Sequence, residues 1–140
     1  EMEVLNESWE IMLKDVISSL HEQMSREEYG ILSEEFGTYI ADREYEYRQL
    51  LEYFVYRYFL KAVRDFDLLS KIKAMIVFVF AAEVINLSRE QDALARFETV
   101  KELCKEIEYS GDNMDRIYDD SYLSDIFSDI SMLALLEWTL

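Results

Sequence analysis

One carboxylate stands in the most apolar stretch of the sequence. It is Glu83, in the run KAMIVFVFAAEVINL from Lys73 to Leu87. A carboxylate in such surroundings must be paired, reach solvent at a cleft, or take a raised pKa. We expect an Arg or Lys of the preceding aromatic stretch, such as Arg57, to be its partner. Structural ion pairs perturb pKa values as readily as active sites do, so we predict that Glu83 is paired rather than catalytic.

Tyrosines surround Arg57 in the sequence, and Tyr53 and Tyr56 lie within one helical turn of it. Aromatic rings can line a pocket for a cationic amine, although at helical spacing they more often pack in the core with their hydroxyls at the rim. Tyr53, Tyr56, Arg57 and Glu83 are therefore our candidate contacts for a ligand or partner. A ligand sensor built on them would need a closed cavity of roughly several hundred Å³.

The sequence gives little support for a metal site or for a nucleophilic residue. The chain has one cysteine, Cys104, and one histidine, His21, far apart in the sequence, and zinc needs three or four such ligands in register. Cys104 lies on an apolar stripe, which favours a buried structural thiol. The sequence has no Gly-rich phosphate loop and no G-x-S-x-G motif. We predict no metal site and identify no catalytic residue.

These residues must be held by helices. The chain contains no proline and three glycines, too few for the frequent turns of a sheet. We predict an all-α fold, a single domain over residues 1–140 with about six to seven helices. The apolar stretch is expected to form a buried central helix at about 67–89, covered all round. The helix at about 42–64 should pair with it as an antiparallel hairpin, because so few residues separate them.

The remaining helices follow from capping residues and from apolar residues spaced three and four apart. We predict helices from Asn6 or Ser8 to Gln23, from Ser25 to about Ile40, from Asp92 or Thr99 to Tyr109, from Asp112 to Tyr118, and from Ser121 to Trp138. In the hairpin's first helix, the buried face should comprise Leu50, Leu51, Phe54, Val55, Tyr58, Phe59 and Ala62. In the helix ending at Tyr109 it should comprise Leu94, Phe97, Val100, Leu103, Cys104 and Ile107, with Glu106 and Glu108 outside.

The final helix is too apolar to remain in water. It either closes over the bundle or meets another domain or subunit. Leu136, Trp138 and Leu140 are our candidate interface residues, and a homodimer through this helix is one expected use of them.

The chain is strongly acidic, with a net charge of -16. This excess disfavours nucleic acid and anionic membrane surfaces, both of which attract Lys and Arg. Residues 43–73 are the exception, with 5 acidic and 7 basic residues. The longest apolar run, Ala74 to Ala82, is too short for the roughly 20 residues of a membrane span. A single cysteine and no signal peptide suggest a reducing, cytoplasmic location.

Two segments resemble a known family. The first is LLEYFVYRYFLKAVRDFDLLSKIK from Leu50 to Lys73, and the second is LCKEIEYSGDNMDRI from Leu103 to Ile117. They resemble the C-terminal region of bacterial flagellin lysine-N-methylases, with its Y-F-x-Y-R-x-F-L-x-A-x-x-D-x-D-L and E-I-E-x-S-x-x-N patterns. The matching residues are Tyr53, Phe54, Tyr56, Arg57, Phe59, Leu60, Ala62, Asp65, Asp67 and Leu68, then Glu106, Ile107, Glu108, Ser110 and Asn113. Phe66 stands where the family pattern has glycine.

The resemblance implies a helical, non-catalytic C-terminal domain of a longer protein, which agrees with a first residue, Glu1, that is not Met. The parent would methylate lysines of flagellin, using S-adenosylmethionine and an iron–sulfur cluster held by an N-terminal cysteine cluster that this chain lacks. The implied partners are the parent's N-terminal domain and flagellin. Two alternatives from other classes remain, a self-sufficient acidic interaction or dimerisation module and a small-molecule sensor.

Overall fold

The structure is a computed structural model that describes residues 7–23, 37–89 and 92–139. Within these ranges the chain forms helices and no strand, as the all-α prediction requires. In order they are α1 (Glu7–Gln23), α3 (Glu44–Asp65), α4 (Leu68–Ser88), α5 (Ala93–Leu103), the π-helix η1 (Cys104–Glu108), α6 (Gly111–Leu123), the 3-10 helix η2 (Asp125–Phe127) and α7 (Asp129–Thr139). Residues 37–41 are also helical. Most of the helix expected from Ser25 lies outside the described residues.

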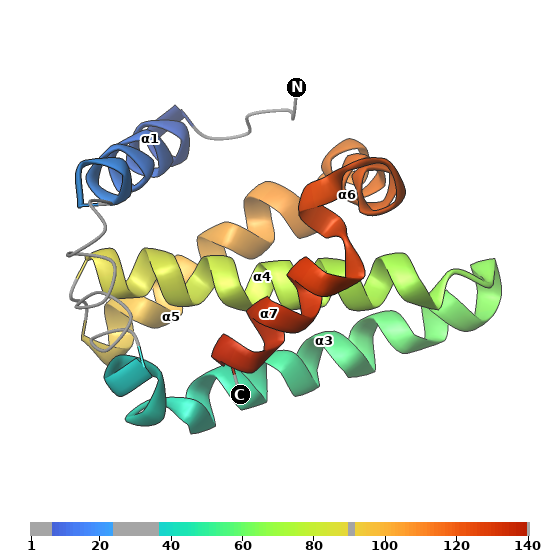
Figure 1. The fold of residues 1–140 in the computed structure, drawn as a ribbon, viewed down its shortest axis with the longest axis horizontal. Helices are drawn as coiled ribbons and strands as arrows, with labels where there is room; N and C mark the ends of the chain where they lie inside the picture. The colour runs from blue at the N-terminus through green and yellow to red at the C-terminus, as the bar shows by residue number, and fades with distance from the viewer. Residues whose placement is uncertain (1–6, 24–36, 90–91, 140) are drawn as a thin grey trace.

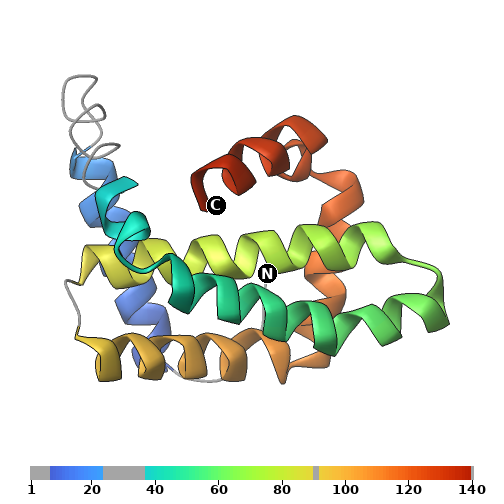
Figure 2. The same cartoon turned by 90° about the horizontal axis from the view of Figure 1, so that it is seen from below.

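The predicted hairpin is present, formed by α3 and α4 lying side by side and antiparallel (Figures 1 and 2). The turn between them forms because Asp67 caps α4, accepting a hydrogen bond from the Ser70 backbone N–H at 3.2 Å. Phe66 ends α3 in the left-handed conformation, with φ 59°. The rings of Phe54 and Phe78, 5.4 Å apart, set the register of the two helices.

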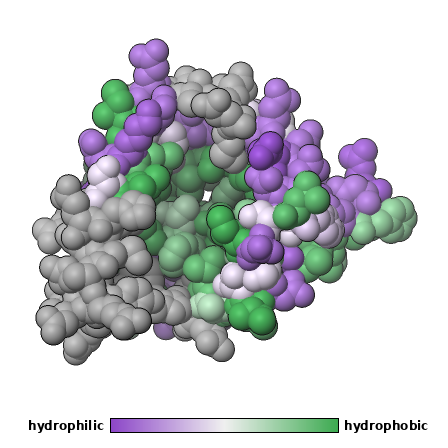
Figure 3. All heavy atoms as spheres, turned by 45° about the horizontal axis from the view of Figure 1, so that its top comes forward, coloured by the Kyte–Doolittle hydropathy of each residue, from purple (hydrophilic) through white to green (hydrophobic). Residues whose placement is uncertain are grey.

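The central helix is α4, which contacts α1, α3, α5, α6 and α7. Its buried side chains, among them Phe78, Val79 and Ala82, form the middle of the core. The expectation that α4 is covered all round is wrong along one face. Val77, Phe80, Ala81 and Val84 are only half-buried, and Figure 3 shows apolar side chains in a hollow between α1 and α6.

Two predicted apolar faces need correction. In α3, Phe54, Tyr58 and Ala62 are buried as expected, but Val55 and Phe59 are exposed. The larger error concerns α5, whose predicted buried residues Leu94 and Phe97 are exposed while Arg96 and Thr99 are buried. The ion pair that Arg96 forms with Glu46 of α3, with Nε 2.8 Å from Oε2, turns this side of α5 inward. A tertiary contact has overridden the apolar pattern.

The helix predicted from Ser121 to Trp138 is interrupted. The first of its residues extend α6 to Leu123, η2 follows, and α7 begins at Asp129. Ser128 starts α7, because its Oγ accepts a hydrogen bond from the Ser131 backbone N–H at 3.3 Å. Among the helices that the structure describes, none combines the length and apolarity of a membrane span.

Candidate functional site

The candidate site lies where α3 meets η1. Arg57 of α3 forms an ion pair with Glu108, the last residue of η1. The Glu108 side chain is 1% exposed and that of Arg57 is 36% exposed, so the guanidinium covers the carboxylate from the solvent side. The Tyr53 hydroxyl adds a hydrogen bond to Glu108 Oε1 at 3.3 Å. Two side chains of α3 therefore neutralise the Glu108 carboxylate and replace the hydrogen bonds that water would give it.

Two aromatic rings flank this ion pair. The Arg57 guanidinium carbon lies 6.0 Å from the centre of the Tyr53 ring and 5.9 Å from that of Tyr109. At these distances the ring faces attract the cation weakly. Burial raises the pKa of Tyr53, with the Arg57 charge acting in the opposite direction. The site can hold one cation between two tyrosines and a carboxylate, and Arg57 is that cation.

The π-helix explains why Glu108 and Tyr109 both reach α3. In η1 the Tyr109 backbone N–H donates to the Cys104 carbonyl at 3.1 Å, one residue further than in an α-helix. The turn is fastened to α6, where Asn113 Nδ2 donates to the Glu106 carbonyl at 2.8 Å. Ser110 completes this joint by capping α6 through the Asn113 N–H at 3.2 Å.

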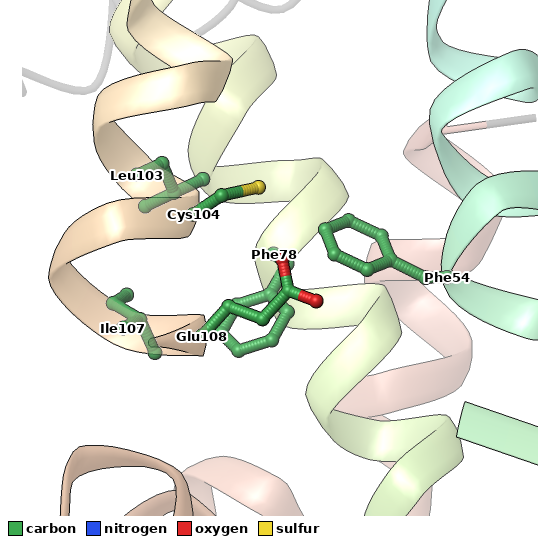
Figure 4. Close-up of a pocket in the computed structure, with 6 residues that line it drawn as sticks. All are labelled: Phe54, Phe78, Leu103, Cys104, Ile107 and Glu108. Carbon is green, nitrogen blue, oxygen red and sulfur yellow. The ribbon is translucent and has the colours of Figure 1, made fainter. Parts of the chain in front are cut away.

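Behind Glu108 lies a narrow apolar crevice that has no room for a water molecule. Figure 4 shows Cys104 and Glu108 of the η1 turn pointing into it, opposite Phe54 and Phe78. Burial raises the pKa of the Cys104 thiol, which keeps it protonated near neutral pH. The thiol is half-buried rather than fully buried as predicted, and its structural role stays a prediction.

These contacts unite the two segments that resemble lysine-N-methylases. Tyr53 and Arg57 belong to the first segment, and Glu108, Ser110 and Asn113 belong to the second. The family model of the FliB lysine N-methylase C-terminal domain matches residues 1–135.

The chain belongs to this family. No curated protein and no solved structure matches it. The FliB C-terminal domain is thus an all-α domain whose family motif is, in this chain, a set of contacts between α3, η1 and α6.

The four predicted contact residues do not form one cluster. Tyr53 and Arg57 meet at Glu108, but Tyr56 is exposed and lines a different, shallow groove. Glu83 is fully buried in α4 and its charge is felt by Tyr47, whose pKa is raised chiefly by burial. Tyr47 precedes Arg57 in α3 by nearly three helical turns. The expected pairing of Glu83 with Arg57 is therefore wrong, because the hairpin register places them apart.

A polar network that the sequence analysis missed lies near Glu83 in the FliB domain. The Tyr47 hydroxyl is 2.9 Å from that of Tyr39 and accepts a hydrogen bond from Asn86 Nδ2 at 3.1 Å. Tyr47, Asn86 and Arg96 line a groove of about 430 Å³ between α3, α4 and α5. Asn86 was the available signal, since it is a second polar residue in the apolar run that contains Glu83.

The interface candidates are only partly described. Leu136 is half-buried on α7. Trp138 belongs to α7, but its side chain lies outside the description, as does Leu140 entirely. The candidate dimer helix therefore stays a prediction at these three positions.

Cysteine and metal-ligand content bear on the expected iron–sulfur cluster, which stays a prediction for the parent protein. The whole chain has a single cysteine, and among the described residues no group of His, Cys, Asp and Glu is arranged to hold a metal ion. The described crevice beside Glu108 is too small for a ligand, so the ligand sensor at Arg57 stays a prediction without support from this crevice.

Proposed function

We propose that this FliB C-terminal domain is a non-catalytic, supporting and substrate-recruiting part of a lysine N-methylase. The observation that carries the proposal is the Arg57–Glu108 contact. The buried Glu108 carboxylate is neutralised by an arginine and hydrogen-bonded to Tyr53, an arrangement that suits fastening helices rather than abstracting protons.

The parent protein would supply the chemistry. We place S-adenosylmethionine and an iron–sulfur cluster in its N-terminal domain, which would be the first partner of this domain in a bacterial cytoplasm. The second partner would be flagellin, the methyl acceptor. A net charge of -16 supports this role, because an acidic surface speeds the encounter with lysine-bearing substrates.

The isolated domain should not transfer methyl groups. Incubated with S-adenosylmethionine and flagellin, it should leave flagellin unmodified by mass spectrometry, while the longer protein modifies it. Methylation by the domain alone would overturn the non-catalytic assignment. A coding sequence upstream of Glu1 without clustered cysteines would contradict the parent chemistry.

Recruitment is tested in the longer protein. Asp112 and Asp115 are exposed on α6. Replacing both with Asn should raise the KM for flagellin severalfold and leave kcat unchanged, because only the encounter is weakened. Lys105→Gln on η1 is the control, which should not raise KM. An unchanged KM in the double variant would remove the acidic surface from the proposal.

A second function is favoured by a separate observation. Many large apolar side chains of the hairpin and of the η2–α7 segment are exposed, which is typical of an interaction module. These exposed side chains form a different surface from the Arg57–Glu108 contact.

A further inference from the structure

The tip of the α3–α4 hairpin carries an exposed apolar surface. Phe66 is 94% exposed at the turn and Leu60 is 71% exposed one and a half turns before it. We call this surface the tip patch, and it consists of Leu60, Val63, Phe66, Leu69 and Ile72. Several large apolar side chains exposed at one end of a hairpin are typical of a place where something binds.

The ring of Phe66 is left in solvent at the end of α3. The φ of Phe66, 59°, is a conformation that suits glycine and strains a bulky L-residue. The turn would therefore form more readily with glycine. A strained backbone and a ring left in water are both disadvantages for the isolated fold, so the ring has the properties of an anchor for a partner.

The tip patch is basic in an acidic molecule. Lys61 and Arg64 are exposed beside it. Lys71 offsets one of the two neighbouring acids, with its Nζ 3.0 Å from Asp65 Oδ2 and 3.3 Å from Asp67 Oδ2. Together with Lys61 and Arg64, it leaves the tip one positive charge in excess. The partner that fits is therefore an apolar surface with acidic residues at its edge.

This chain carries such a surface next to the tip patch. We call it the C-terminal patch, and it consists of Leu123, Ile126, Ile130 and Leu133, all exposed on the segment from α6 to α7. Asp125 is exposed within it. The two patches are neighbours, because Tyr122 donates a hydrogen bond to Asp67 and Lys73 Nζ lies 3.1 Å from Asp129 Oδ1.

We propose that the domain forms a two-fold dimer in which the tip patch of each copy covers the C-terminal patch of the other. A two-fold axis that passes between the adjacent patches places the tip patch of each copy on the C-terminal patch of the other. The same contact then forms twice, and no patch is left open. Phe66 of each copy enters the C-terminal patch of the partner. Lys61 and Arg64 lie against the acidic edge that contains Asp125.

The first test uses Phe66→Gly in the 140-residue chain. Glycine removes the anchor and relieves the backbone, so the monomer should stay folded while the dimer dissociation constant, measured by sedimentation velocity, rises at least about tenfold. Leu94→Ser is the matched control, an exposed apolar residue at the start of α5, and it should leave the constant unchanged. A chain that is monomeric at every concentration overturns the proposal.

The second test identifies the occupant by charge exchange. Arg64→Glu and Asp125→Lys should each weaken the homodimer, because each places like charges across both contacts. An equimolar mixture should restore the dimer, since one contact then has both charges reversed and the other is native. Failure of the mixture to associate overturns the proposal in favour of another partner. A dimer that is lost in Leu136→Asp but kept in Phe66→Gly overturns it in favour of a dimer that uses the end of α7 without the tip patch.

Discussion

At the residue level, the ion pair between Arg57 and Glu108 joins the two segments that resemble the family. A carboxylate that is 1% exposed depends on its partners, whereas an exposed ion pair contributes little. The sequence pointed to Tyr53 and Arg57 but assigned them to the wrong acid. The helical pattern placed Glu108 on the outside, so Glu83 was the only acid considered, and the hairpin register together with the η1 turn reveals Glu108 instead.

Arg57→Ala should destabilise the domain. It removes the charge that neutralises Glu108, and we expect the free energy of unfolding in urea to fall by about 1 to 3 kcal/mol. Arg48→Ala is the control, because its ion pair with Glu52 is exposed on both sides, and it should cost less than about 0.5 kcal/mol. Equal losses in the two variants would show that Arg57 is only a surface residue.

Phe66→Gly should have the opposite effect on stability. The left-handed conformation costs an L-residue about 1 to 2 kcal/mol, partly offset because glycine gains more freedom in the unfolded chain. We expect the free energy of unfolding, measured at a concentration where the chain is monomeric, to rise by roughly 0.5 to 1 kcal/mol. A loss of stability would mean that the ring contributes packing within the monomer.

The turn of the hairpin should be sensitive to acid. Burial raises the pKa of Asp67, but hydrogen bonds from Ser70 and Tyr122 and the charge of Lys71 outweigh it and lower the pKa to about 2. A depressed pKa stabilises the fold above the unfolded value near 4, and this contribution is lost as the pH falls from about 4 to 2.

Asp67→Asn removes this titration and one acceptor of the cap. It should cost about 1 to 2 kcal/mol at pH 7 and progressively less towards pH 2, as followed by urea unfolding. Asp92→Asn at the exposed start of α5 serves as the comparison. A cost for Asp67→Asn that is the same at pH 7 and pH 2 would assign the effect to the shape of the cap rather than to its charge.

At the level of elements, the sequence predicted the hairpin well because its signals agree. The apolar run, the absence of glycine and proline, and the cap at Asp67 all favour two helices with a short turn, and α3 and α4 end within one or two residues of the expected positions. The error at the last helix has a local cause, since Ser124 and Ser128 each support a helix start and the apolar pattern continues across both.

The π-helix could not be predicted from helical spacing. A period of 3.6 residues places Glu106 and Glu108 on the outside, and both are buried from solvent in the structure. The additional residue in the η1 turn rotates the segment after Cys104 relative to α5. Pattern analysis assumes one period throughout, so it loses the orientation of every residue beyond such a turn.

Asn113→Ala should loosen this joint. The side chain is buried, and its loss leaves the Glu106 carbonyl without the donor at 2.8 Å. We expect a cost of about 1 to 3 kcal/mol, with faster hydrogen exchange at Tyr109 and Ser110 than in α3. Ser131→Ala on α7 is a suitable control. Exchange that rises uniformly over the domain would indicate general destabilisation instead of a local opening of η1.

At the level of the whole molecule, the sequence predicted the fold class and the centre of the core, but it could not predict the surface. Leu94, Phe97, Ile126 and Ile130 all follow helical patterns that usually mark burial, and all are exposed. Spacing reports which residues share a face of a helix. Whether a neighbouring helix covers that face depends on tertiary contacts such as the Arg96–Glu46 ion pair.

The charge of the whole molecule leads to a last prediction. A net charge of -16 over 140 residues produces repulsion across distances that salt screens, since the screening length falls from about 30 Å at 0.01 M to about 8 Å at 0.15 M. The described ion pairs act in the opposite direction, because salt also weakens them, but half of them join exposed side chains three or four residues apart and contribute little. Long-range repulsion should therefore prevail, and the melting temperature followed by circular dichroism should rise by a few degrees between these salt concentrations.

NaCl and KCl should act equally, which separates screening from ion-specific effects. A melting temperature that falls with salt would mean that the ion pairs, with Arg57–Glu108 and the pairs of Lys71 foremost, stabilise the domain more than its net charge destabilises it.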